Sequence, residues 1–199
     1  MKNRMQIRKM VGISILTAMV VILQLLSSFI KFGPFSATLA LIPLIMGAII
    51  YGPLVGTILG LTMGVVILAT DAQAFFVVNP FFTILLCLAK TAVSGLVSGY
   101  IYKALAKKNK HLGIILAALA TPIVNTGLFA LGTIAFFYNT LVQWAGGSNA
   151  LSYLFLTMIG FNFLIEFSLN AILSPTFIYL TNVLNKNIFN IESVDLWFY

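Results

Sequence analysis

The fold is decided by one long apolar stretch, IPLIMGAIIYGPLVGTILGLTMG, at residues 42–64. The apolar segment around it runs from Thr38 to Ala69, which is longer than the roughly 17–25 residues that one membrane-spanning helix needs. The run Tyr51-Gly52-Pro53 interrupts this segment, because proline lacks a backbone donor and disfavours helix in the residue before it. We therefore expect two shorter spans, residues 38–51 and 53–69, joined by a tight turn.

Four further segments satisfy the same length rule, at residues 10–30, 80–104, 112–137 and 151–184. The chain is 61% hydrophobic and 8% charged, against roughly 45–50% and about 25% in an ordinary soluble domain. The sequence thus predicts an all-α, multi-pass cell-membrane protein with six transmembrane helices, and residues 1–199 form a single integral domain.

The positions of the basic residues predict the orientation. They lie before the first span, between the fourth and fifth, and after the sixth: Lys2, Arg4, Arg8, Lys9, Lys103, Lys107, Lys108, Lys110 and Lys186. Short cytoplasmic loops are enriched in Lys and Arg, so both termini are expected in the cytoplasm and the outer loops near residues 31–36, 70–79 and 138–150. The net charge of +7 then reflects topology and anionic lipid rather than nucleic acid.

Glycine recurs every four residues in the third span, at Gly52, Gly56, Gly60 and Gly64. Residues with this spacing share one helix face, and a face of small residues permits close helix packing. Either this face packs within the chain, which we favour, or it receives another subunit. Thr91, Gly95 and Gly99 repeat the pattern in the fourth span.

The residues needed for catalysis are missing at membrane depth. The only histidine, His111, lies in a lysine-rich loop, so neither a Ser-His-Asp triad nor a zinc helix can form in the membrane. The chain has no P-loop motif for ATP. Cys87 has no partner cysteine, and Glu166 is the only acid at membrane depth. We expect no enzyme, no metal and no cofactor.

A layer of polar residues lies at one depth. Lys90, Asn125, Asn162 and Glu166 fall within about 8 Å of the same depth at 1.5 Å per helical residue, and Gln24 of the first span reaches a comparable level. Polar groups left unpaired in hydrocarbon cost several kcal/mol. They either bond between helices or face a solute pocket, and the layer as a whole favours a substrate-binding pocket.

Lys90 is the charged residue of this layer that most needs a compensating group, because a lysine near the middle of a span costs about 2.5–3.5 kcal/mol. Three partners are open: Glu166 in an ion pair, backbone carbonyls with trapped water, or the carboxylate of an anionic substrate.

The outer loop TDAQAFFVVNPFF, residues 70–82, lies just above the polar layer. Asn79 and Phe76 are candidate substrate contacts in this loop, and Phe75 is the neighbouring aromatic residue. The phenylalanines either cap the pocket or lie in the aromatic belt of the membrane interface.

Three segments carry a resemblance to a known family: residues 31–64, residues 79–103 and TPIVNTGLF at 121–129. They resemble the substrate-binding S components of energy-coupling factor (ECF) vitamin transporters. GPFSATLALIP, NPFFTILLCLAK and PIVNTG look most like the pantothenate-specific branch. The resemblance implies a high-affinity vitamin-binding subunit of an ABC-type importer, which works with a transmembrane scaffold subunit and two ATPases. It also implies binding groups in the outer loops and last three spans.

In such proteins, a small-residue AxxxA pair on the first span meets the scaffold. This sequence has Ser14 and Ala18 there, with Gly12 nearby, so the resemblance implies docking at these residues although a serine replaces the first alanine.

Two other functions remain open. One is an S component for another vitamin, such as pyridoxine, folate, riboflavin or thiamine. The other is a stand-alone secondary transporter, which would show internal repeats around a midplane site; the sequence has no convincing repeat. Solute flux by the purified chain alone would favour the second.

Overall fold

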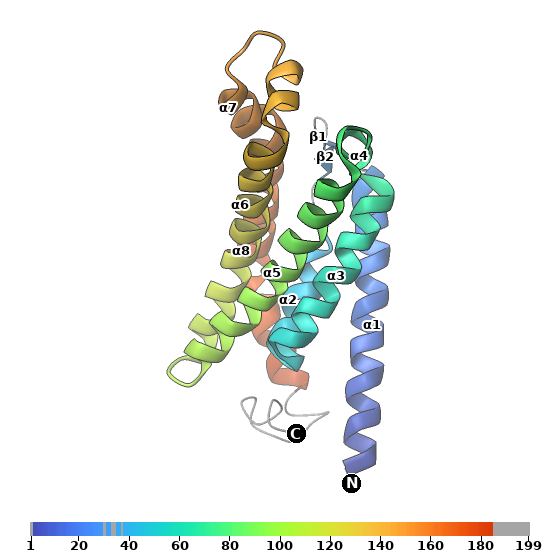
Figure 1. Cartoon of the computed structure of the whole chain (residues 1–199). Coiled ribbons are helices and arrows are strands. Elements are labelled where there is room, and N and C mark those ends of the chain that lie inside the picture. Colours follow the sequence, from blue (N-terminus) through green and yellow to red (C-terminus); the bar gives the residue numbers. More distant parts are fainter. Residues whose placement is uncertain (1, 30, 33–34, 37, 185–199) are drawn as a thin grey trace.

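The computed structural model describes residues 2–29, 31–32, 35–36 and 38–184, and these residues form a bundle of long helices (Figure 1). The helices are α1 (Lys2–Phe29), α2 (Leu41–Tyr51), α3 (Pro53–Thr70), α4 (Gln73–Val78), α5 (Pro80–Ala106), α6 (Lys110–Trp144), α7 (Ala150–Ser152), the π-helix η1 (Tyr153–Gly160) and α8 (Phe161–Leu184). The strands β1 (Lys31–Phe32) and β2 (Phe35–Ser36) pair antiparallel between α1 and α2. The predicted all-α fold is confirmed, apart from this short hairpin.

Among the described residues, five helical segments are long and apolar enough to cross a membrane: Gln6–Phe29, Pro53–Thr70, Pro80–Ala106, Lys110–Trp144 and Ala150–Val183. The span predicted at residues 38–51 is instead the shorter helix α2, which has 11 residues. At 1.5 Å per residue it is about 16 Å long, roughly half of the hydrocarbon thickness. Five of the six predicted spans are therefore helices of spanning length, whereas the second, expected as a shorter span, has 11 residues and is not confirmed as a span.

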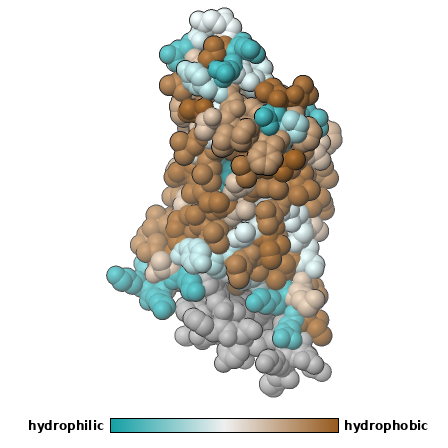
Figure 2. Space-filling model, in the orientation of Figure 1, coloured by the Kyte–Doolittle hydropathy of each residue, from teal (hydrophilic) through white to brown (hydrophobic). Residues whose placement is uncertain are grey.

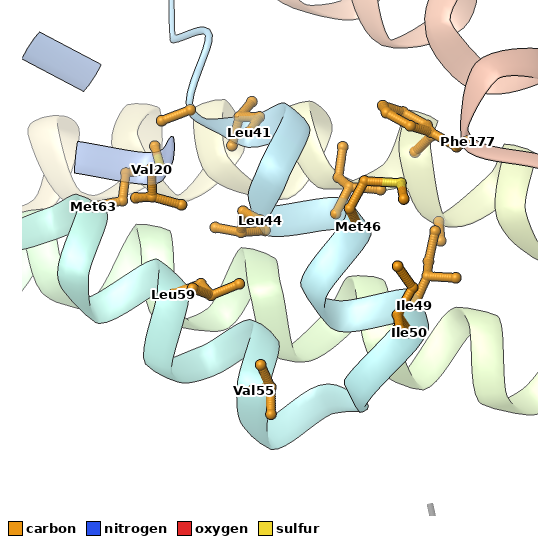
Figure 3. Close-up of a cluster of buried hydrophobic side chains, with 14 of the residues drawn as sticks. Val20, Leu41, Leu44, Met46, Ile49, Ile50, Val55, Leu59, Met63 and Phe177 are labelled. Atoms are coloured by element: carbon orange, nitrogen blue, oxygen red, sulfur yellow. The ribbon is translucent and has the colours of Figure 1, made fainter. Parts of the chain in front are cut away.

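Helix α2 lies in the interior of the bundle, and nearly all of its side chains are buried. Figure 3 shows Leu44 and Met46 of α2 among Val20 of α1, Leu59 of α3 and Phe177 of α8. All of these side chains are apolar and belong to one buried cluster. A helix that is apolar on every face is expected to be enclosed by other helices rather than to form an outer surface.

Helices α3 and α5 pack through their small residues. A Cβ at Gly56 would overlap the backbone oxygen of Gly95, and a Cβ at Gly60 would overlap the backbone oxygen of Thr91. The prediction that the glycine face packs within the chain is confirmed, and the repeat at Thr91, Gly95 and Gly99 lies on the matching face, with Gly99 against Pro53.

The two ends of the bundle are polar, and a broad apolar band separates them (Figure 2). The start of α1, the turn between α5 and α6, and the end of α8 lie at one end (Figure 1), where Lys110 Nζ donates to Asn182 Oδ1 at 2.9 Å. This grouping agrees with the predicted topology. The assignment of this end to the cytoplasm stays a prediction, and Lys186 with the tail 185–199 lies outside the described residues.

We expect Gly60→Ala to destabilise the protein, because its methyl group would overlap the carbonyl of Thr91. Overpacking of this kind costs about 1–3 kcal/mol. The matched control is Gly127→Ala on α6, where a Cβ meets no atom within 4 Å and where the exchange should be neutral or stabilising by about 0.4–1 kcal/mol. Thermal unfolding in detergent measures both, and equal midpoints for the two variants would show that the α3–α5 contact is looser than described.

Candidate functional site

A cavity of about 70 Å³ lies inside the bundle, with room for about five water molecules. Every spanning helix contributes to its wall, as does the segment that precedes α2. Its polar lining residues are Gln24, Thr38, Asp71, Lys90, Asn125, Thr126, Asn162 and Glu166, and its apolar ones are Ile67, Ala72, Phe75, Cys87, Phe129, Met158, Ile159 and Phe163.

The structure brings together five of the seven residues that the sequence proposes for substrate binding. Lys90, Asn125, Asn162, Glu166 and Gln24 all line this cavity. Apart from Lys90, which is partly exposed, these side chains are nearly or fully buried. The equal depths counted along separate helices therefore correspond to one shared cavity.

Asn79 and Phe76 do not line it. The Asn79 side chain caps the start of α5 by accepting a hydrogen bond from the Phe82 N–H at 3.2 Å, which is a common role for asparagine at a helix N-terminus. Phe76 is 38% exposed, whereas its neighbour Phe75 is 3% exposed and lines the cavity.

Glu166 binds the backbone that enters the bundle ahead of α2. Its Oε1 accepts a hydrogen bond from the Thr38 N–H at 2.8 Å. Thr38 lies outside any helix, so this N–H has no helical partner, and a buried backbone donor needs one. Glu166 thus fixes the start of the buried segment that carries α2.

The Lys90 side chain contacts an aromatic ring. Its Nζ lies 4.9 Å from the centroid of the Phe129 ring, a cation–π contact worth about 0.5–2 kcal/mol. Within the part of the chain that the structure describes, no ion pair within 4.0 Å joins Lys90 to Glu166 or Asp71. Of the three partners considered for Lys90, the ion pair with Glu166 is absent from this conformation.

Several oxygen atoms of the cavity wall have no hydrogen-bond partner among the described residues: Gln24 Oε1, Asp71 Oδ1, Asn125 Oδ1 and Glu166 Oε2. An unsatisfied buried polar group costs about 1–3 kcal/mol. Amide and ionised carboxylate oxygens only accept hydrogen bonds. The wall is therefore suited to water or to a ligand that carries several O–H or N–H groups.

An aromatic cluster packs around Phe75, which lines the cavity. The ring centroid of Phe75 lies 5.8 Å from that of Phe129, 4.9 Å from Phe137 and 5.1 Å from Trp144. All three partner rings belong to helix α6. The cluster therefore packs α4, which connects α3 and α5, against α6.

The residues of the cavity wall that were not predicted from the sequence include Asp71, Thr38 and Phe129. Phe75, one of the two rings considered as a cap of the pocket, does line it. The sequence places Asp71 in a predicted outer loop. In the structure it follows α3 directly and lines the cavity. Phe129 lies one helical turn after Asn125, and that spacing could have indicated it. Thr38 bonds Glu166 through its backbone, so its side chain gives no such signal.

The docking residues proposed on α1 differ in their surroundings. Ser14 and Ala18 are exposed. Gly12 faces α2, since a Cβ there would overlap the Tyr51 hydroxyl. The glycine therefore allows α1 and α2 to approach each other within the chain.

A family model assigns the chain to a defined class of transport proteins. The family model described as "ECF transporter, substrate-specific component" matches residues 8–178. The chain belongs to this family. No curated protein and no solved structure matches it.

Family membership confirms the resemblance at this level. The protein is a substrate-binding subunit of an ECF transporter, a multi-pass component of the cell membrane. It is a transport component rather than an enzyme. Its partners are a small-molecule substrate and the ECF scaffold and ATPase subunits.

We expect Glu166→Leu to lower the thermal stability, because it leaves the buried Thr38 N–H without an acceptor, at about 1–3 kcal/mol. Glu166→Gln keeps a side-chain oxygen as an acceptor for that N–H and should lose less thermal stability. Unfolding midpoints of the two variants in detergent separate the hydrogen bond from the charge. If both variants unfold at the same temperature, the Thr38–Glu166 bond does not stabilise the fold.

Proposed function

We propose that the cavity binds pantothenate from the outer side and that the vitamin's carboxylate binds Lys90. The observation that carries this proposal is a lysine in the cavity wall with an aromatic contact but no carboxylate partner among the described residues. A buried ammonium is stabilised by an opposite charge within a few ångströms, and pantothenate is an anion at neutral pH.

The remaining wall suits the rest of the molecule. Pantothenate carries one amide N–H, which can donate to an unpaired oxygen of Asn125 or Glu166, and two hydroxyls, which can donate to further unpaired oxygens of the wall. Asn162 and Gln24 add further amide groups to the same wall. The apolar side chains of Met158, Ile159 and Phe129 suit its two methyl groups.

The size of the cavity supports a small vitamin. At about 70 Å³ it must widen for any vitamin, and folate or riboflavin would require far more widening than pantothenate. A second candidate is pyridoxine, a neutral ring with several hydroxyls, which the excess of unpaired acceptor oxygens favours. Lys90 distinguishes the two, because pyridoxine offers it no carboxylate.

We also propose that the scaffold subunit docks on the Ser14 and Ala18 face of α1. Helix α1 lies at the edge of the bundle (Figure 1) and is the least buried of the five spanning segments. Small exposed residues allow another helix to approach closely. With the basic end in the cytoplasm, the cavity faces the outer half of the membrane.

We expect Lys90→Met to fold and to bind pantothenate roughly ten- to a hundredfold more weakly, since charged hydrogen bonds contribute about 1.5–3 kcal/mol. Pantothenol has an alcohol in place of the carboxylate and should lose little affinity from the same substitution. Isothermal titration of both ligands against the wild type and the variant measures the difference. Equal losses for both ligands would make Lys90 structural, and no loss for either would place the carboxylate elsewhere.

We expect Ala18→Trp to block vitamin uptake in cells while the purified variant still binds the vitamin, because the large ring prevents close helix approach at the proposed docking face. The matched control is Ile123→Trp, an exposed apolar position on α6, which should leave uptake intact. Normal uptake with Ala18→Trp would show that the scaffold docks on another surface.

A further inference from the structure

Gln24 and Asp71 form a hydrogen-bonded pair between α1 and the end of α3. Gln24 Nε2 donates to Asp71 Oδ2 at 3.2 Å, and the Thr70 hydroxyl lies 3.1 Å from the same oxygen. The Asp71 backbone is also held, because its N–H donates to the Ile67 carbonyl at 2.8 Å. Both residues line the cavity, so their side chains are fixed in its wall.

Each residue of the pair presents one oxygen that has no partner in the described part of the chain. These atoms are Gln24 Oε1 and Asp71 Oδ1, and both are buried. The chemistry fixes the amide orientation, since a reversed Gln24 would place its oxygen against the Asp71 carboxylate. The two free atoms can therefore only accept hydrogen bonds.

The negative and positive groups of the cavity are kept apart. No ion pair within 4.0 Å joins Asp71 to Lys90 among the described residues. The Asp71 carboxylate is held by Gln24 and Thr70, whereas the Lys90 ammonium lies over the Phe129 ring. The Asp71 carboxylate and the Lys90 ammonium can therefore contact different parts of one ligand.

We infer that Gln24 and Asp71 form a subsite that selects a neutral, hydroxyl-bearing end of the substrate and rejects an anion there. This inference rests on the proposed function, in which Lys90 binds the carboxylate end. Two neighbouring acceptors suit two hydroxyl donors. A negative group at that end would meet Asp71, and like charges in a site of low dielectric repel strongly.

Two consequences for selectivity follow. An analogue without the two hydroxyls leaves both oxygens unpaired and loses affinity. A phosphate ester on the terminal hydroxyl introduces an anion beside Asp71 and is excluded. The subsite thus favours the unphosphorylated vitamin over its phosphorylated form, a choice that Lys90 alone could not make.

The test titrates three ligands into the purified full chain: pantothenate, N-(3,3-dimethylbutanoyl)-β-alanine, which lacks both hydroxyls, and 4′-phosphopantothenate. The variants are Gln24→Leu and Asp71→Asn. The matched control is Gln73→Leu, because Gln73 is an exposed glutamine at the same end of the bundle and is not among the residues of the cavity wall.

Gln24→Leu should lower the affinity for pantothenate roughly five- to a hundredfold and leave the affinity for the hydroxyl-free analogue unchanged. Gln73→Leu should change neither affinity. The ratio of the Kd for 4′-phosphopantothenate to the Kd for pantothenate should fall at least tenfold in Asp71→Asn. Equal losses for pantothenate and the hydroxyl-free analogue, or an unchanged preference in Asp71→Asn, would overturn the subsite. If the wild type does not bind pantothenate, the proposed function itself fails, and the assignment of its hydroxyl end fails with it.

Discussion

The hydrogen bond from the Thr38 N–H to Glu166 Oε1 is the interaction on which the rest of the arrangement depends. Non-helical backbone inside a membrane bundle lacks water and must be satisfied by the protein. The chain enters the bundle from the β1–β2 hairpin without helical bonds, and Glu166 and the Ser27 hydroxyl accept the N–H groups of Thr38 and Leu39. These two bonds allow a short helix, α2, to occupy the interior of the bundle.

The non-helical segment that leads into α2 divides the bundle into two parts. Around α2, apolar side chains from α1, α3 and α8 form a closed core, and glycine and threonine backbones bring α3 against α5. Around the non-helical segment, α2 no longer fills the space, and polar side chains from α1, α5, α6 and α8 line a cavity. The unpaired oxygens of that wall are a stability cost in the empty protein, and a ligand with matching donors would remove it.

Hydropathy, glycine spacing and depth counting sufficed to predict the long helices, the packing of the glycine face within the chain and the convergence of Lys90, Asn125, Asn162 and Glu166. These features follow from periodic patterns within single helices. The start of the second span was predicted at residue 38 but α2 begins at Leu41, because hydropathy cannot show that the first residues of an apolar segment stay non-helical. Asp71 was missed as a site residue for a related reason: contacts between a loop and a distant helix leave no periodic signal. Phe76 was chosen in place of Phe75 because sequence alone does not fix which neighbouring ring turns inward.

The central claim is that this cavity holds one small anionic vitamin. Native mass spectrometry of the protein, released from membranes of cells supplied with pantothenate, tests it most directly, since a tightly bound molecule is identified by its mass. We expect one bound pantothenate per wild-type chain and none on the Lys90→Met variant. A different bound molecule, or pantothenate that Lys90→Met retains in full, would contradict it.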